Sequence, residues 1–182
     1  IVPGENLGFG RACNRGAAGA AAEFLLFLNP DARLRPDTIA QLIAAARRFP
    51  QASAFGAALV DADGHIGYKR RTRLAPAAVS GPKRTPQTDT EVPALSGAAM
   101  MVRRAAFEAV GGFDPAIFLY YEDDDLSVRL RAACGPLIFV PSAIATHFSG
   151  KSSAPSPELS RFKGYHWARS RIYTARKHGL AA

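Results

Sequence analysis

Cysteine is scarce in this chain, which contains only Cys13 and Cys134 among its 182 residues. Neither belongs to a Cys-x-x-Cys pair or to a cysteine–histidine cluster, so we predict neither a zinc site nor a disulfide-stabilised secreted scaffold. A long apolar segment is also lacking, because the run over residues 17–28 is interrupted by Glu23 and is too short to span a bilayer. No signal-peptide pattern is present, and these absences together favour a cytoplasmic protein.

Acidic residues are the minority among the charged side chains, with 15 Asp and Glu against 23 Lys and Arg, which gives a net charge of +8. Such a charge favours an anionic partner, a class that includes nucleic acid, a phosphorylated sugar donor and an acidic membrane surface. The length and the 48% hydrophobic content predict one globular domain over residues 1–182 and exclude a disordered chain. The sequence starts at Ile1 without an initiator methionine, so we expect an excerpt of a longer protein.

The hydrophobic pattern alternates between strand-like runs and helical spacing, which predicts an α/β fold with a mostly parallel sheet and flanking helices. The expected strands cover residues 24–28, 54–60, 93–102, 137–140 and 143–146. The expected helices cover residues 11–22, 37–49, 104–110, 123–133 and about 158–178. Residues 24–28 are apolar at every position, a pattern that suits a parallel strand buried on both faces. Residues 68–91 lack periodicity and are rich in Pro, Lys, Arg and Thr, so we expect a surface loop.

Four consecutive carboxylates, Glu122-Asp123-Asp124-Asp125, lie between two aromatic residues and an apolar segment. One interpretation is a solvated helix N-terminus, where the helix dipole favours acidic side chains. The other is a catalytic carboxylate placed next to a metal or a cationic group. Taken alone, the stretch favours the first interpretation, and the surrounding motifs favour the second.

Two further motifs offer ligands for a divalent cation. Asn29-Pro30-Asp31 follows the strand over residues 24–28 and is either a plain strand-to-turn transition or a site where Asp31 holds a cation. His147 follows a β-branched strand and, although a lone histidine is more often structural, its imidazole suits Mn²⁺. Both positions lie at the ends of expected strands, where ligands of α/β proteins gather.

Six motifs occur in an order that is informative as a set. They are Asn6-Leu7-Gly8-Phe9-Gly10 with Asn14-Arg15-Gly16, Leu28-Asn29-Pro30-Asp31, Ser96–Arg104, Val110-Gly111-Gly112-Phe113-Asp114, Tyr121–Leu126 with Arg129-Leu130, and His147. This set resembles the family-2 glycosyltransferases, and among them the bacterial rhamnosyltransferase-like enzymes of cell-surface polysaccharide assembly. The resemblance implies a Rossmann-like GT-A fold, a nucleotide-sugar donor, Mg²⁺ or Mn²⁺ as cofactor, and inversion at the anomeric carbon.

The resemblance also implies roles for single residues. Asp31 is implied as the metal-binding acid and His147 as a second metal ligand, while Asp123 matches the general base. Glu122 and Asp125 are implied to support that base or to orient the acceptor. We expect the neighbouring carboxylates to raise the pKa of Asp123 towards a range that is useful for proton transfer.

The implied donor contacts lie in separate segments. Asn29 occupies the place of the first acid in the family's metal motif, so its contact with the donor is a hydrogen bond and not a charge. Gly97 and Ala98 are implied to lie under the donor sugar, where a bulky side chain would block its approach. The remaining implied donor-binding positions, which line the helix that backs the nucleotide, are Asn6, Gly10 and Asn14.

The sequence departs from the family pattern at its start, because the first two strands, which hold the base and the ribose in relatives, are not present. The chain keeps the metal-binding and catalytic half. We therefore expect transfer of a sugar from a dTDP- or UDP-sugar to a hydroxyl of a glycan or lipid-linked acceptor. An inactive remnant or a non-catalytic binding domain with the same fold stays open as the alternative.

The basic segments over residues 69–73, 83–84 and 158–178 have two interpretations. They are solvated surface, or they act together as a surface that contacts the inner face of the plasma membrane. A nucleic-acid-binding module, suggested by the net charge, requires aromatic residues interleaved with the basic ones or a recognisable motif, and neither is found. The expected partners are therefore a nucleotide-sugar donor and a glycan or lipid-linked acceptor, and no nucleic acid.

Overall fold

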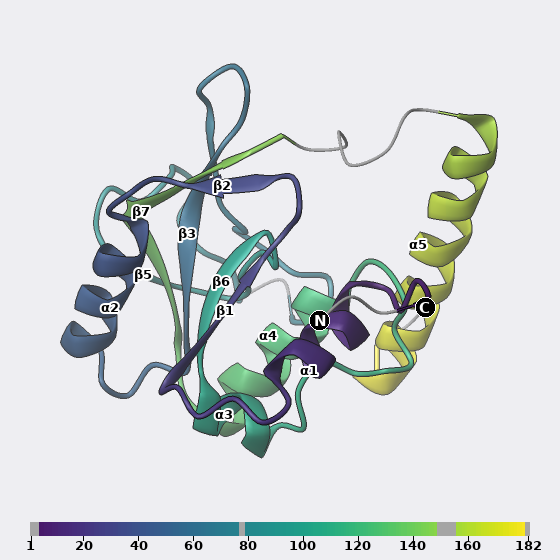
Figure 1. Cartoon of the computed structure of the whole chain (residues 1–182), viewed down its shortest axis with the longest axis horizontal. Coiled ribbons are helices and arrows are strands. Elements are labelled where there is room, and N and C mark those ends of the chain that lie inside the picture. Colours follow the sequence, from purple (N-terminus) through teal and green to yellow (C-terminus); the bar gives the residue numbers. More distant parts are fainter. Residues whose placement is uncertain (1–3, 77–78, 149–155, 181–182) are drawn as a thin grey trace.

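The computed structural model describes residues 4–76, 79–148 and 156–180 of the chain (Figure 1). The helices are α1 (Phe9–Ala17), α2 (Thr38–Arg48), α3 (Arg104–Ala109), α4 (Glu122–Ala133) and α5 (Pro157–Lys177). The strands are β1 (Phe24–Leu28), β2 (Ala32–Leu34), β3 (Ala54–Val60), β4 (Ile66–Gly67), β5 (Thr90–Val92), β6 (Ala99–Arg103) and β7 (Leu137–His147).

The strands form one mixed sheet with the order β1-β6-β3-β7-β2, to which β4 is added beside β3 and β5 beside β7. β3 and β7 run parallel, and the other strand pairs within the described ranges are antiparallel. The prediction of an α/β fold with flanking helices is confirmed. The prediction of a mostly parallel sheet is wrong.

Strand β1 shows why the hydrophobic pattern does not predict whether neighbouring strands run parallel or antiparallel. Leu25 and Phe27 join one hydrophobic core, while Phe24 and Leu26 pack against the other. An uninterrupted apolar run indicates that both faces of a strand are covered, and here it occurs in a strand whose neighbour β6 is antiparallel. The run therefore predicted the strand and its covered faces, but not the direction of its neighbour.

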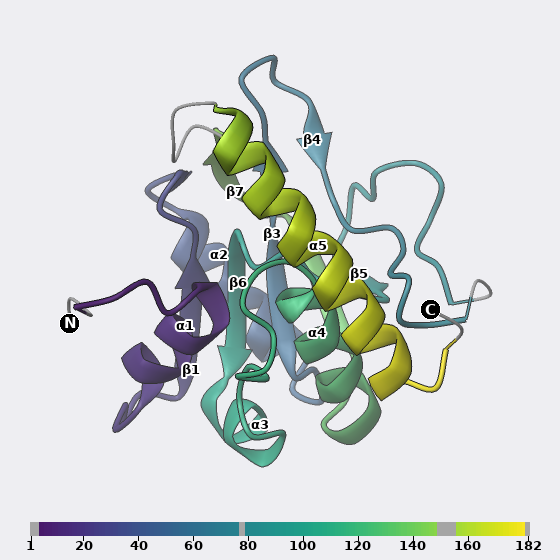
Figure 2. The ribbon, with the colours of Figure 1, turned by 90° about the vertical axis from the view of Figure 1, so that its right-hand side faces the viewer.

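Helices cover both faces of the sheet (Figure 1). α2 packs on one face through Leu42, Ala45 and Ala46, which follow helical spacing. α1, α3 and α4 cover the other face, where Phe107 and Leu126 belong to the same core as Leu25 and Phe27. α5 lies across the outer side of α4 with most of its length exposed (Figure 2). None of the helices within the described ranges has the length and apolar character that crossing a membrane requires.

Strand boundaries differ from the prediction at places that bear on the cavity described below. β7 runs unbroken through Pro141 because its register against β3 shifts between Ala57 and Ala58, and a bulge tolerates a residue without an N–H donor. β6 begins at Ala99, so residues 93–98 form a largely buried loop and not a strand. β2, β4 and β5 have two or three residues each and are too short for the hydrophobic pattern to reveal.

Residues next to the first and last helices determine where these helices begin or end. α1 stops at Ala17, earlier than expected, because Gly19 adopts a left-handed backbone that does not continue a helix. The expected C-terminal basic helix is confirmed as α5. Ser156 caps it by accepting a hydrogen bond from the Leu159 N–H at 3.1 Å, and Pro157 stands in the first turn, where a missing N–H costs nothing.

Candidate active site

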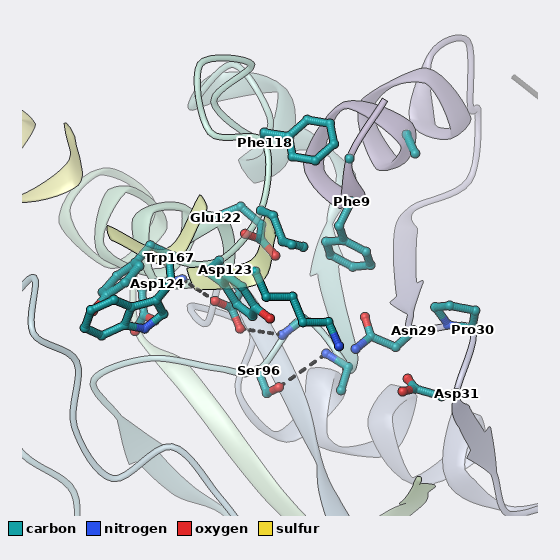
Figure 3. Close-up of a pocket in the computed structure, with 18 of the residues that line it drawn as sticks. Phe9, Asn29, Pro30, Asp31, Ser96, Phe118, Glu122, Asp123, Asp124 and Trp167 are labelled. Carbon is teal, nitrogen blue, oxygen red and sulfur yellow. Dashed lines mark hydrogen bonds between the residues drawn. The ribbon is translucent and has the colours of Figure 1, made fainter. Parts of the chain in front are cut away.

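A cavity of about 970 Å³ opens between the ends of β1 and β7, the start of α4 and the side of α5 (Figure 3). Eight of the eleven site residues expected from the sequence line it, namely Asn6, Asn29, Asp31, Gly97, Ala98, Glu122, Asp123 and His147. The three that do not are Gly10, Asn14 and Asp125. Segments that are distant in sequence thus supply one shared surface.

The two expected metal ligands lie beside each other on neighbouring strands. The pairing of β2 with β7 places Ala32 opposite His147, so Asp31 stands next to the imidazole. His147 Nε2 and Asp31 Oδ1 are 3.2 Å apart, and both residues line the cavity. Adjacent ligands of an octahedral ion with bonds of about 2.1 Å lie about 3 Å apart, so this pair fits one Mg²⁺ or Mn²⁺ ion. Two protein ligands leave positions for phosphate oxygens, which Mg²⁺ sites commonly use.

A group of side chains of the types that bind metals lies in the exposed turn between β3 and β4 and does not line the cavity. Its members are Asp61, Asp63 and His65. The Asp61 carboxylate accepts hydrogen bonds from the N–H groups of Asp63 and His65, each at 2.9 Å. These contacts explain Asp61 as a turn-forming residue.

The floor of the cavity is made by the segment after β1 and the loop before β6. The Asn29 N–H donates to the Ala98 carbonyl at 3.1 Å, which ties the two segments together. Gly97 lies in this loop, where a β-carbon would meet the Phe9 ring at 3.0 Å and the Asp123 Cβ at 3.3 Å. The missing side chain at position 97 therefore lets the loop approach the helix that carries Asp123.

Asp123, the expected general base, holds its carboxylate in a fixed orientation in the first turn of α4 (Figure 3). Its Oδ2 accepts a hydrogen bond from the Gly97 N–H at 3.0 Å and lies 2.8 Å from Lys69 Nζ. Burial favours the neutral acid, but the Lys69 charge and the hydrogen bonds outweigh it and hold the pKa of Asp123 below its usual value. The expectation that neighbouring acids raise this pKa is wrong, because a lysine from another segment compensates their charge.

Lys69, from the loop after β4, bridges two of the acids. Its Nζ lies 2.8 Å from Oδ2 of Asp123 and 2.8 Å from Oδ2 of Asp124. Burial disfavours the charged ammonium group, yet attraction to the two carboxylates is stronger and raises the pKa of Lys69. The pKa of Asp124 is raised by burial and by the charge of Asp123, although Lys69 opposes this. The sequence placed Lys69 only in a basic surface segment, with no local signal of this role.

Glu122, the first acid of the cluster, has a pKa near neutrality. It is 9% exposed, and its Oε2 atom has no hydrogen-bond partner within the described ranges. Burial and the charge of Asp123 raise the pKa of Glu122 to about 7, although the Lys69 charge opposes this. The raised proton affinity that the sequence assigned to Asp123 therefore belongs to its neighbours.

The chain turns sharply into α4 at two consecutive tyrosines. Tyr120 and Tyr121 have φ values of 66° and 67°, a left-handed backbone that costs roughly 1–2 kcal/mol for each non-glycine residue. The turn brings the first residues of α4 to the cavity wall, and the Tyr121 ring centroid lies 6.1 Å from that of Trp167 on α5. Backbone strain of this kind concentrates at functional sites.

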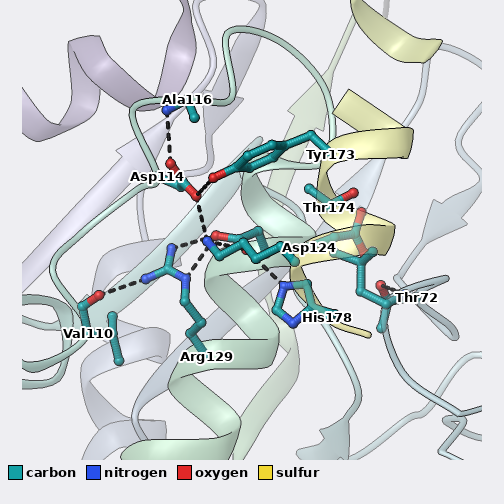
Figure 4. A network of polar contacts seen from close by, with 12 residues as sticks. Thr72, Val110, Asp114, Ala116, Asp124, Arg129, Tyr173, Thr174 and His178 are labelled. Carbon is teal, nitrogen blue, oxygen red and sulfur yellow. Dashed lines mark hydrogen bonds and ion pairs between the residues drawn. The ribbon is translucent and has the colours of Figure 1, made fainter. Parts of the chain in front are cut away.

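Asp125 does not line the cavity, and it joins α4 to α5 through a buried ionic network, of which Figure 4 labels Asp114, Arg129 and His178. Its fully buried carboxylate lies 2.8 Å from Arg129 Nε, 2.8 Å from Lys177 Nζ and 2.9 Å from His178 Nε2. Lys177 also lies 2.6 Å from Asp114. The structure therefore places Asp125 outside the cavity lining, where its contacts with Lys177 and His178 hold α5 in place.

Asn14 and Gly10 do not line the cavity, and both serve packing between α1 and the loop before α4. The Asn14 amide donates to the Phe113 carbonyl at 2.7 Å and accepts from the Phe113 N–H at 2.9 Å, which uses both ends of the side chain. A β-carbon at Gly10 would lie 3.0 Å from the Phe113 Cβ. Asn6 does line the cavity, and its Oδ1 accepts a hydrogen bond from the Gly8 N–H at 3.0 Å.

Basic and aromatic side chains form another part of the cavity wall. Arg71 and Arg73 come from the loop after β4, and Lys163 comes from α5. Within the described ranges none of these three cations lies in an ion pair with a carboxylate. Phe162 and Trp167 of α5 line the same cavity. The structure thus brings residues of two basic segments, 69–73 and 158–178, to the wall of one cavity.

Comparison with known proteins gives matches along most of the chain. Residues 1–111 match the family described as glycosyl transferase family 2. The chain is 34% identical to an N-acetylglucosaminyl-diphospho-decaprenol L-rhamnosyltransferase of Mycobacterium tuberculosis (strain CDC 1551 / Oshkosh), in an alignment that covers 98% of this chain and 67% of that relative. It is 35% identical to Rhamnosyltransferase WbbL of Escherichia coli (strain K12) over 55% of this chain and 37% of that protein.

Two solved structures share the arrangement of helices and strands. GalNAc-T7 with UDP, GalNAc and Mn²⁺ has a TM-score of 0.64 and 18% identity, covering 96% of this chain and 38% of that one. The mannosyltransferase PcManGT from Pyrobaculum calidifontis, in complex with GDP-Man and Mn²⁺, has a TM-score of 0.64 and 17% identity, covering 100% and 47%. The chain spans less than half the length of either protein, and at these identities the likeness shows the fold alone.

Proposed function

The chain belongs to glycosyl transferase family 2, and on that premise we propose that it transfers a sugar from a dTDP- or UDP-sugar to an acceptor hydroxyl, with inversion at the anomeric carbon. The chain is a glycosyltransferase with the expected GT-A fold. One observation carries the finer proposal: Asp123 and the Asp31–His147 pair line the same cavity. The cavity therefore offers both a base for the acceptor hydroxyl and ligands for a metal ion at the leaving group.

A single displacement accounts for the inversion. The acceptor oxygen attacks the anomeric carbon while the bond from that carbon to the nucleoside diphosphate breaks, and the bonding electron pair leaves on the diphosphate. Asp123 takes the hydroxyl proton as the new carbon–oxygen bond forms, and a positioned base of this kind contributes about 10²–10⁴-fold. The fixed orientation of its carboxylate, set by Gly97 and Lys69, supports this assignment.

We propose Asp31 and His147 as ligands for Mg²⁺ or Mn²⁺. A divalent ion bound there supplies compensation for the charge that develops on the leaving diphosphate. The 3.2 Å separation of the two ligand atoms supports this assignment, as does their position in the cavity. Asn29 adds a hydrogen bond to the donor without adding charge, while Gly97 and Ala98 leave room for the sugar.

The acceptor that we propose is a sugar carried on a lipid diphosphate, which assigns the protein to cell-surface polysaccharide synthesis. The mycobacterial relative is named for transfer of L-rhamnose to N-acetylglucosaminyl-diphospho-decaprenol. Arg71, Arg73 and Lys163 form no ion pair with a carboxylate of the described residues, and cations of this kind suit a diphosphate group. Phe162 and Trp167 beside them suit an apolar chain.

A lipid-linked acceptor requires contact with a membrane, and we propose that the outer face of α5 supplies it at the inner face of the plasma membrane. This helix exposes large apolar and aromatic side chains, of which Phe162 is 41%, Tyr165 62% and Ile172 45% exposed. Arg161 and Arg169 are exposed on the same helix, and each basic residue near an anionic surface contributes about 1 kcal/mol. Because α5 also lines the cavity, docking of this face would bring the acceptor near α4.

The test is transfer of L-rhamnose from dTDP-L-rhamnose to a synthetic N-acetylglucosaminyl diphospho-lipid by the full-length protein. Asp123→Asn is expected to lower kcat by about 10²–10⁴-fold, because the amide cannot accept the proton. Asp61→Asn, in the exposed turn between β3 and β4, is the matched control and should keep the wild-type kcat. Chelation of the metal should abolish transfer, and added Mn²⁺ should restore it.

Two outcomes would contradict the proposal. Near-normal kcat in Asp123→Asn would overturn the assignment of the base. A full-length protein that is inert with a panel of dTDP- and UDP-sugars would favour the inactive remnant.

A further inference from the structure

We propose that Lys69 is a positioning residue for this reaction, whose ammonium group holds the Asp123 carboxylate in its orientation and in its charged form. The inference rests on the proposed function, since it requires Asp123 to be the general base. Lys69 belongs to the basic run over residues 69–73, in a loop that the sequence presents as solvated surface.

The inference rests on the contacts of one oxygen atom, Oδ2 of Asp123. Oδ2 of Asp123 receives the Gly97 N–H at 3.0 Å and the Lys69 ammonium at 2.8 Å, from two loops that are separate in sequence. The Lys69 side chain is 26% exposed, so its ammonium group is partly shielded from water. Together with the Asp124 N–H, which donates to Oδ1 at 2.8 Å, these two donors restrain the orientation of the carboxylate. A displacement of 1 Å at such a group can cost about 100-fold in rate.

The charges on α4 explain why a cation is required at this point. Glu122 and Asp124 flank Asp123, and repulsion between adjacent carboxylates favours uptake of a proton by one of them. Lys69 is the cation that pairs with Asp123 in the described part of the chain. The other charged or titratable groups that line the cavity are Glu5, Asp31, Arg71, Arg73, Tyr120, Tyr121, His147 and Lys163. Lys69 compensates the charge of Asp123 at 2.8 Å, and within the described ranges neither Arg71, Arg73 nor Lys163 forms an ion pair with that carboxylate.

Asp124 holds the lysine from its other side. Its Oδ2 lies 2.8 Å from Lys69 Nζ, which makes the ammonium group a bridge between two neighbouring carboxylates. The directions of the pKa changes agree with this geometry, since that of Lys69 is raised and that of Asp123 is lowered. An arginine keeps such a bridge, whereas a neutral side chain of similar length does not.

The test compares pH profiles of kcat for the full-length protein and its variants, with dTDP-L-rhamnose and the synthetic diphospho-lipid. Lys69→Met should shift the acid limb of the profile upward by about 1–3 pH units, the effect expected from removing an opposite charge next to a carboxylate. It should also lower kcat at pH 7 by about ten- to hundredfold, with little change in the KM for the donor. Lys69→Arg should restore the acid limb. Lys83→Met, at an exposed lysine of the same loop, is the matched control and should change neither quantity.

The outcomes separate this inference from the proposed function. If Asp123→Asn abolishes transfer and the acid limb of Lys69→Met stays at its wild-type position, the function stands and the Lys69 inference is refuted. If Asp123→Asn remains active, both are overturned. Lys69→Gln, measured in parallel and checked by thermal unfolding, answers the same question if the methionine variant fails to fold.

Discussion

Replacing Glu122 by glutamine is expected to change how the stability of this protein depends on pH. The Glu122 carboxyl group is buried beside the charge of Asp123, and its pKa is raised from 4.5 to about 7. A carboxyl group whose pKa is raised by folding stabilises the folded state while it is protonated. Its contribution is therefore complete below about pH 4.5 and is lost as the pH rises through 7. Glutamine resembles the protonated acid at every pH.

The size of the effect follows from the same two values. The interval between 4.5 and about 7 corresponds to about 3 kcal/mol. Relative to wild type, the free energy of unfolding of Glu122→Gln should rise by about this amount between pH 5 and pH 8.5. In a domain of this size the gain equals about 6–12 °C in Tm. Any cost of burying the amide is the same at each pH and leaves the slope unchanged.

Urea unfolding, followed by circular dichroism at half-unit pH intervals, measures this slope. Glu108→Gln, at an exposed glutamate on α3, is the control and should differ from wild type by a constant amount. A constant difference for Glu122→Gln over the same range would refute the reasoning. It would also remove the argument that Glu122, and not Asp123, has the raised proton affinity.

Two further outcomes are expected. Asp125→Asn should lower the free energy of unfolding by about 3–5 kcal/mol in urea denaturation, because Arg129, Lys177 and His178 lose a buried counterion; unchanged stability would contradict the network. The full-length protein should sediment with vesicles that contain phosphatidylglycerol, less so at high salt and less so in the variant Arg169→Glu. Equal sedimentation with neutral vesicles would contradict the docking of α5.

The sequence predicted the elements better than their pairing. The acidic run indicated the start of α4, because acidic side chains favour a helix N-terminus. Turn residues and helical spacing likewise located α2 and α5 to within a few residues. Strand direction is different, because apolar residues at 24–28 report covered faces and contain no information about the neighbour. The antiparallel pairing with β6 depends on the whole sheet.

Sequence motifs predicted which residues line the cavity, but they did not predict contacts between residues that lie far apart in the chain. Asp31 and His147 were assigned from motifs, and the structure brings them to 3.2 Å. Lys69 had no such signal, since its partner Asp123 lies far along the chain and its neighbours are equally basic. The position of Asp125 outside the cavity had an available signal, because it follows Asp123 by two residues and residues two apart on a helix lie about 200° apart around its axis.

That angular separation divides the acidic run into two independent units. Asp123 and Asp124 face Lys69 on the cavity side, whereas Asp125 faces Lys177 on the other side of the helix. Neighbouring acids of one short run therefore serve different parts of the molecule. A change at Asp125 alters the contacts that hold α5, while a change at Asp123 alters the Lys69 contact at the cavity.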